Sequence, residues 1–228
     1  MLRKTKGGIA MAQRIVHYAF ASLIAGGLEP ADRARFLLGS LLPDAYTEKD
    51  ERDLTHYTMR EGNLVWFDFG AFAKEFPREV RSDPLYLGYY LHLVEDDLHR
   101  RLIHETYQNR FTPRNDDELR LLYRDYHILN RRLSDRYDLR DELILPPDFR
   151  SLPLNARVPL DAEGMIAELR ADLIDNEPGD PVWITEEMMA AFIAESLPVL
   201  EKETAAALRG ETTLSARDFA WERHARYN

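Results

Sequence analysis

The sequence predicts a single all-α domain over residues 1–228. Apolar residues recur at helical spacing along most of the chain, and capping residues or prolines precede several of these segments. We find no convincing apolar–polar alternation of the kind that marks a half-buried strand, and no repeat or low-complexity tract. With 45% hydrophobic residues among 228, the chain can bury a substantial core.

Four helices are predicted in the first half of the chain, at residues 9–25, 30–42, 64–76 and 84–109. Two glycines follow the first helix and can supply a left-handed stop. Pro30 lies in the first turn of the second helix, and Pro43 ends it. Residues 44–63 are polar and are predicted to form a loop. The third helix is rich in aromatic residues, and Asp83 caps the fourth, which is the central helix.

The second half is predicted to contain helices starting after residue 115, at 161–174, at 186–208 and, as a short last helix, at 215–226. Asn115 and Thr185 are the expected N-caps. Pro198 lies inside the long third helix of this half and is expected to bend it, and Gly210 stops it. Residues 142–160 are rich in proline and leucine, and we expect them to form a long connection packed over the body.

Composition excludes several classes of function. The formal net charge of −10 argues against nucleic-acid binding and against attraction to anionic membranes. A small anionic substrate remains compatible, because a bound metal reverses the field locally. No apolar run approaches the roughly 18 residues of a membrane-spanning helix, and polar residues interrupt the N-terminal apolar run, unlike a signal peptide. We therefore expect a cytoplasmic protein without a membrane anchor, whose oligomeric state the sequence does not indicate.

The central helix carries the most informative pattern. It is apolar almost all round from Leu85 to Val94, as a buried helix is. Yet His92, Asp96 and His99 share one of its faces at i, i+4 and i+7. A buried carboxylate is costly unless it is paired, hydrogen-bonded or bound to a metal. Imidazole and carboxylate suit zinc, although the same groups could instead bond each other or an arginine.

Three further residues are candidate ligands, and each has an ordinary alternative. Asp44 follows Pro43 at a rigid corner, but it could be a simple turn residue. His56 lies in the predicted loop, where an exposed histidine is more common. His17 lies on the first helix and could be a core histidine. Because the chain has no cysteine, any zinc site must use His, Asp and Glu.

Three segments carry a family resemblance: F-L-L-G-S-L-L-P-D-A at 36–45, T-H-Y at 55–57 and L-Y-L-G-Y-Y-L-H-L-V-E-D-D at 85–97. In order, spacing and context they resemble the zinc-dependent phospholipase C-like hydrolases. That family includes bacterial phospholipase C and, more remotely, zinc-dependent single-strand nucleases of the same α-helical fold. The resemblance covers roughly residues 12–135 and implies this helical fold.

The resemblance implies a set of zinc ligands. One zinc would be bound by Asp44, His56, His92 and Asp96, and a second by His17 with Asp96 bridging the two. Asp44 would also be the base for the attacking water. Glu95 and Asp97 lie off the ligand face of the central helix. We expect them to accept hydrogen bonds from the ligand side chains or to face solvent.

The chain also departs from the family pattern. A third zinc there uses a later histidine of the central helix and an H-x-x-x-E pair on a later helix. His99 does not have the expected spacing, and Arg131 stands four residues after His127 in place of Glu. Asp125 or Asn130 would have to substitute, so one or two zinc ions are expected.

The favoured function is zinc-dependent hydrolysis of a small anionic phosphoester, phosphodiesters included, by a water whose pKa the metal lowers. The main alternative is a metal-binding helical protein of this fold without turnover. A second is a purely structural scaffold whose His and Asp residues pair with one another. An HD-type phosphohydrolase is disfavoured, because the chain has no adjacent His-Asp pair.

Overall fold

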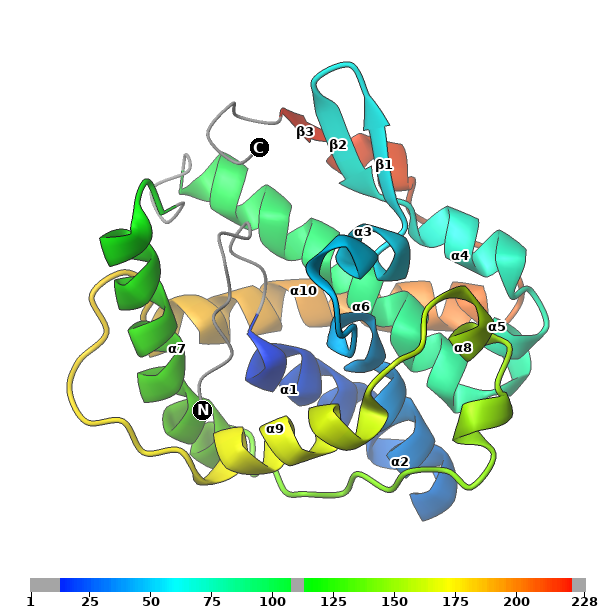
Figure 1. Ribbon diagram of the computed structural model, residues 1–228, viewed down its shortest axis with the longest axis horizontal. Helices are drawn as coiled ribbons and strands as arrows, with labels where there is room; N and C mark the ends of the chain where they lie inside the picture. Colours follow the sequence, from blue (N-terminus) through cyan, green and yellow to red (C-terminus); the bar gives the residue numbers. More distant parts are fainter. Residues whose placement is uncertain (1–12, 108–112, 223–228) are drawn as a thin grey trace.

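The computed structural model describes residues 13–107 and 113–222, and this part of the chain is mostly helical (Figure 1). The α-helices are α1 (Arg14–Ile24), α2 (Pro30–Gly39), α3 (Arg52–Thr55), α4 (Phe69–Glu75), α5 (Glu79–Ser82), α6 (Pro84–Arg101), α7 (Asp116–Arg136), α8 (Leu154–Arg157), α9 (Ala162–Ile174) and α10 (Glu186–Ala207). The short helical turns are η1 (Ala25–Gly27), η2 (Leu42–Asp44), η3 (Lys49–Glu51), the π-helical η4 (Leu102–Thr106), η5 (Phe149–Ser151) and η6 (Ala216–Phe219). The strands are β1 (Thr58–Glu61), β2 (Leu64–Phe67) and β3 (Trp221–Glu222).

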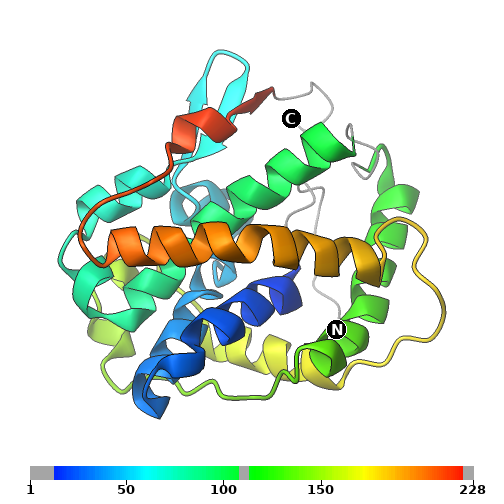
Figure 2. The same cartoon turned by 180° about the vertical axis from the view of Figure 1, so that it is seen from behind.

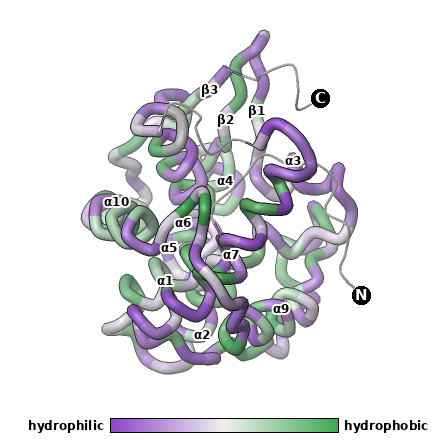
Figure 3. Tube along the Cα trace, turned by 90° about the vertical axis from the view of Figure 1, so that its left-hand side faces the viewer, coloured by the Kyte–Doolittle hydropathy of each residue, from purple (hydrophilic) through white to green (hydrophobic). Residues whose placement is uncertain are grey.

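Helix α6 is the centre of the molecule, as the apolar pattern predicts. Every residue from Leu85 to Arg100 is buried. Helices α2, α4, α5 and α10 all pack on α6, and α10 also contacts α1 on the rear face (Figure 2). In Figure 3, hydrophobic positions recur along α6, whereas the outer turn near α3 is hydrophilic. A polar side chain on α6 therefore lies in the interior unless a gap opens to solvent.

Two glycines let α2 lie directly against α6. A Cβ at Gly39 would come within 2.0 Å of the carbonyl oxygen of Leu85, and a Cβ at Gly88 within 2.3 Å of that of Phe36. Only glycine permits this backbone contact. The contact brings the residues after α2, from Ser40 through η2, next to the middle of α6.

Three of the predicted helix starts, at Asp83, Asn115 and Thr185, are confirmed by their capping hydrogen bonds. The side chain of Asp83 accepts a hydrogen bond from the Leu85 backbone nitrogen at 3.0 Å. Asn115 caps α7 through the nitrogen of Glu118 at 2.9 Å, and Thr185 caps α10 through that of Met188 at 3.3 Å. Gly210 has φ +75° just after α10, the left-handed conformation expected of a helix stop.

A small antiparallel sheet, in the order β1-β2-β3, corrects the prediction of a purely helical chain. Residues 64–67 form β2 and not the start of a helix, and the helix of this region is α4 alone. The two-residue turn at Gly62, where φ is +59°, joins β1 to β2 and pairs Thr58 with Phe67. Gly-Asn between two strand-forming segments is a hairpin signal that the helical interpretation overlooked.

The expected last helix at 215–226 is also wrong in its described part. That part consists of η6 and strand β3, whose Trp221 pairs with Val65 of β2, and residues 223–226 lie outside the described part. The predicted loop at 44–63 contains the end of η2 and all of η3, α3 and β1, and the long connection at 142–160 contains η5 and α8.

Other boundaries shift less. The second helix ends at Gly39, so Pro43 lies inside η2, after the helix end. The predicted start of the first helix at residues 9–12 and the end of the fourth at Asn109 lie outside the described residues. No helix in the described ranges is long and apolar enough to cross a membrane.

Candidate metal centre

The five predicted ligands come from four separate parts of the chain and lie together against α6. His17 is on α1, Asp44 ends η2, His56 follows α3, and His92 and Asp96 are on α6. Ligand atoms of His17, Asp44 and His92 lie within 4.8 Å of one another, and so do those of His56, His92 and Asp96. The two groups share His92, so the five side chains form one continuous cluster.

The carboxylate of Asp96 lies between the histidines. Its Oδ1 is 3.5 Å from Nε2 of His17, and its Oδ2 is 3.5 Å from Nε2 of His56 and 3.6 Å from Nε2 of His92. Asp44 Oδ1 is 3.3 Å from the same His56 nitrogen. Most of these separations are longer than the usual length of an N–H···O hydrogen bond. They do match the distance between two ligand atoms of a tetrahedral zinc site, which is about 3.4 Å when the zinc–ligand bonds are roughly 2.0–2.2 Å long.

The other ring nitrogen of each histidine is fixed by a separate acceptor. Nδ1 of His17 lies 2.6 Å from Oε2 of Glu95, and Nδ1 of His92 lies 2.8 Å from the carbonyl oxygen of Ser40. Nδ1 of His56 lies 3.0 Å from the carbonyl oxygen of Arg52. When each Nδ1 donates to its acceptor, Nε2 carries a lone pair that points into the cluster, as in metal-binding histidines.

The atoms that face the centre of the cluster lack hydrogen-bond partners among the described residues. They are Nε2 of His17, His56 and His92 and both carboxylate oxygens of Asp96, all buried. Leaving one buried polar atom unsatisfied costs about 1–3 kcal/mol, so native proteins rarely leave five together. A cation at this point would satisfy all of them, and imidazole with carboxylate is a donor set that zinc accepts.

Charges within the cluster favour ionised carboxylates. Burial opposes ionisation of Asp44, but its contact with His56 and the positive potential of His92 outweigh burial and lower the pKa of Asp44 well below its usual range. Burial likewise disfavours a charged His17. The carboxylates of Asp96 and Glu95 nevertheless raise the pKa of His17 to about 10. In the metal-free protein these carboxylates therefore favour the protonated form of His17.

The segment around His56 is shaped by its neighbours. His56 is fully buried and is not the exposed loop histidine that base rates favour. Tyr57 has φ +51°, a left-handed conformation that turns the chain directly from His56 into β1. The hydroxyl of Tyr89 donates to the carbonyl oxygen of Thr55 at 2.6 Å and anchors the end of α3 to α6. Both tyrosines are core residues that hold the ligand-bearing segment in place.

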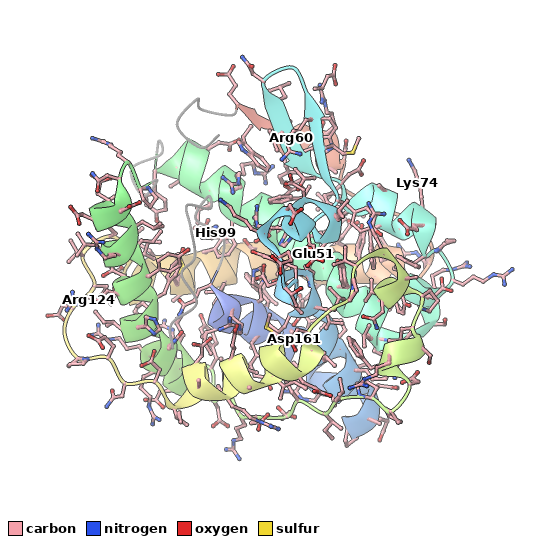
Figure 4. The ribbon with its side chains drawn as sticks, in the orientation of Figure 1. Glu51, Arg60, Lys74, His99, Arg124 and Asp161 are labelled. Atoms are coloured by element: carbon pink, nitrogen blue, oxygen red, sulfur yellow. The ribbon has the colours of Figure 1, made fainter. Side chains whose placement is uncertain are left out.

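Asp44 is the least buried member of the cluster, with a quarter of its side chain exposed. The nitrogen of Asp161, at the start of α9, donates to the carbonyl oxygen of Ala45 at 2.8 Å and fixes the η2 turn from outside (Asp161 is labelled in Figure 4). The rigid corner expected after Pro43 is therefore a short 3-10 turn, fixed from outside by the residue that precedes α9.

The candidates for a further metal site do not join the cluster. His127 is on the surface of α7, with Nδ1 2.5 Å from a carboxylate oxygen of Asp175. Asp125 accepts hydrogen bonds from the backbone nitrogens of residues 182–184, before α10. His99 lies inside on α6, its ring 5.3 Å from that of Phe192, whereas Arg124 lies at the periphery (Figure 4).

Two arginines near the cluster were missed by sequence reasoning. Arg52 is four residues before His56, and Arg100 is four residues after Asp96. This i, i+4 spacing was a usable signal, since it places each arginine one helical turn from a candidate ligand. Of the two alternatives expected for Glu95, a hydrogen bond to a candidate ligand or contact with solvent, the structure shows the first, with His17.

No family model matches the chain, and neither a curated protein nor a solved structure matches it. The interpretation of the cluster therefore depends on its own geometry and on the sequence motifs.

Proposed function

We propose that this protein is a zinc-dependent hydrolase of a small phosphoester, with the helical fold of the phospholipase C-like family. The observation that carries the proposal is the convergence of three histidine Nε2 atoms on the Asp96 carboxylate at 3.5–3.6 Å, all buried and without hydrogen-bond partners among the described residues. The motif order G-x-x-x-P-D, T-H-Y and H-x-x-x-D supports the family assignment.

The five clustered residues would have two roles, binding zinc and activating water. His56, His92, Asp96 and Asp44 would hold one zinc, and His17 together with Asp96 would hold a second. Zinc supplies a Lewis acid for the phosphoryl oxygens and a bound water of near-neutral pKa. Asp44 is ionised and partly exposed, so its carboxylate can accept the proton of the attacking water and orient it.

One observation favours metal binding without turnover as a second candidate. The three histidines and Asp96 are each at most 2% exposed, as expected of a closed structural site. Asp44 alone among the five reaches solvent to any extent. Turnover of a phosphoester by the zinc-loaded protein separates the two functions.

The first prediction tests the metal. Purified protein loaded with zinc should show one or two ions per chain by native mass spectrometry. Zinc at 1,000 times its dissociation constant should raise the free energy of unfolding by about 4 kcal/mol through mass action. Asp96→Asn should lose most of this stabilisation and any hydrolysis of p-nitrophenyl phosphate or bis(p-nitrophenyl) phosphate, because it removes the shared ligand.

Asp97→Asn is the matched control. Asp97 is the next residue on α6 and is equally buried, but its Oδ1 faces the backbone nitrogen of Phe67 at 3.4 Å and lies outside the cluster. Its zinc-dependent stabilisation should equal that of wild type. Equal stabilisation of wild type and Asp96→Asn would refute the metal site, and zinc binding without hydrolysis would favour the second candidate.

A further inference from the structure

Arg52 and Arg100 each lie one helical turn from a proposed ligand. Arg52 begins α3, and its carbonyl oxygen is the group that lies 3.0 Å from Nδ1 of His56. Arg100 follows Asp96 by four residues on α6, so the two side chains share a face of that helix. Two different elements thus bring one guanidinium each to the border of the cluster.

Each guanidinium lies over one ring of an aromatic pair whose two rings contact each other. Cζ of Arg52 is 5.6 Å from the ring centre of Phe67, and Cζ of Arg100 is 4.3 Å from that of Trp221. The two rings contact each other with centres 5.1 Å apart, and the Phe67 ring is 5.4 Å from that of His56. Stacking fixes the plane of a guanidinium while leaving its N–H groups available to an anion.

Among the described residues, neither arginine has a carboxylate within ion-pair distance, although Asp96 and Asp97 attract Arg100 from farther away. Within residues 13–107 and 113–222, no salt bridge involves Arg52 or Arg100, although most arginines of this protein pair with Asp or Glu. Nη2 of Arg52 and Nε of Arg100 are buried without a hydrogen-bond partner among these residues, and Arg100 is only 6% exposed. Burial and the nearby charge of Arg52 lower the pKa of Arg100 to about 9, which still leaves it charged at neutral pH.

The unpaired, buried charge of Arg100 is expensive unless a ligand neutralises it, and the partly buried Arg52 adds a second positive charge nearby. We propose that Arg52 and Arg100 bind the non-bridging oxygens of a phosphate dianion, and that the substrate class is therefore a phosphomonoester. A monoester carries up to two negative charges near neutral pH, which match two guanidiniums, whereas a diester carries one. This inference rests on the proposed function, because it assigns the substrate of the same centre.

The second prediction tests this pair with inorganic phosphate as the probe. Titration calorimetry on zinc-loaded and on chelator-treated protein should show phosphate binding weakened about tenfold or more by Arg52→Gln and by Arg100→Gln, as expected for loss of a charge-assisted hydrogen bond. Zinc stoichiometry should not change. Arg60→Gln is the control, since Arg60 is exposed on β1 and paired with Asp53 at 2.5 Å.

Arg100→Gln should fold, because removing an unpaired buried charge relieves a desolvation cost, and Arg52→Gln should fold because Arg52 is only partly buried. Arg52→Lys and Arg100→Lys keep the charge, so they should retain more phosphate binding than the glutamine variants. In wild type, kcat/KM should be higher for p-nitrophenyl phosphate than for bis(p-nitrophenyl) phosphate, and each glutamine variant should lower the monoester value more.

Three results would overturn the inference: no phosphate binding by wild type, equal phosphate binding by wild type and both glutamine variants, or an equal loss of monoester and diester hydrolysis. Zinc stoichiometry, measured separately on the same samples, shows whether the metal site exists. Failure of the arginine pair and failure of the metal centre are therefore distinguishable.

Discussion

At the scale of single residues, the cluster depends on the two nitrogens of each histidine having different surroundings. His92 shows this most simply, with Nδ1 against the carbonyl oxygen of Ser40 and Nε2 against Asp96. Ser40 directly follows α2 and His92 lies on α6, the two helices joined by the glycine contact. The orientation of a ligand is therefore set by a backbone carbonyl in a neighbouring element and not by the rotamer of the histidine alone.

The third prediction concerns proton release by His17. Burial lowers its pKa, but Asp96 and Glu95 raise it to about 10, so at pH 7 His17 is protonated before metal binds. A ligating histidine must be neutral, so zinc binding there should release a proton. Zinc affinity at this site should rise about tenfold per pH unit between pH 7 and 9 for each proton released. Calorimetry in two buffers of different ionisation enthalpy measures that number.

In the metal-free protein, the contribution of His17 to folding stability falls as the pH rises, whereas zinc affinity rises with pH. The folded-state pKa of His17 is above its unfolded value of 6.5, so its contribution to stability is complete below about pH 6.5 and is lost as the pH rises through about 10. His127→Ala is the control for His17→Ala, because His127 is half-exposed on α7. A proton release that His17→Ala leaves unchanged would mean that another group titrates.

The five clustered residues were each candidates in the sequence, and the family resemblance of the three motif segments joined them into one expected ligand set. Arg52 and Arg100 could not be placed in the same way. Their stacking depends on Phe67 and Trp221, which belong to strands of a sheet that the sequence did not reveal. Local pattern predicts which face of a helix is buried, but not which distant ring meets a side chain on it.

At the scale of elements, the contact of α2 with α6 positions the centre. The fourth prediction is that Gly88→Ala lowers the free energy of unfolding by about 1–3 kcal/mol, the usual cost of overpacking, or more if the helices must separate. The reason is that the new Cβ would lie 2.3 Å from the Phe36 carbonyl oxygen and 2.9 Å from the Ser40 nitrogen. Urea unfolding of the metal-free protein measures the change.

Gly26→Ala is the matched control, since nothing lies within 4 Å of a Cβ at that position and its φ is not left-handed. Its stability should stay within about 0.5 kcal/mol of wild type or rise slightly. Gly88→Ala should also weaken zinc binding, because separating α2 from α6 moves Ser40 away from His92. Unchanged stability and zinc affinity in Gly88→Ala would show that the helices do not need this close approach.

Helices with strong caps could be predicted from sequence, and the short elements could not. Residues Leu64–Phe67 are apolar and aromatic, which suits a buried strand as well as a helix. The four-residue helix α3 has too few residues to be stable alone and owes its form to tertiary contacts, including the Tyr89 hydrogen bond to Thr55. For the same reason His56 is buried although its sequence context resembles a loop.

At the scale of the whole molecule, the centre connects segments that are distant in the chain. Its ligands come from α1, η2, the end of α3 and α6, and a metal bound to all of them would cross-link these elements in the native state. The helical architecture was predictable because long amphipathic and apolar segments dominate the sequence. The arrangement of η2 and α3 over α6 was not, since it depends on backbone contacts such as those of Gly39 and Gly88.

The fifth prediction follows from this cross-linking. Zinc added to the metal-free protein should slow amide hydrogen exchange most in residues 42–56, because these short segments are held by few contacts of their own and open locally at low cost. With zinc at 1,000 times its dissociation constant, amides exposed only when the site opens should gain about 4 kcal/mol of protection.

Residues 149–157, which contain η5 and α8 and no ligand, should exchange at the same rate with and without zinc. Exchange followed by mass spectrometry distinguishes the two segments. If zinc protected residues 14–24 and 84–101 but not 42–56, neither Asp44 nor His56 would be a ligand, and the metal centre would be reduced to His17, His92 and Asp96.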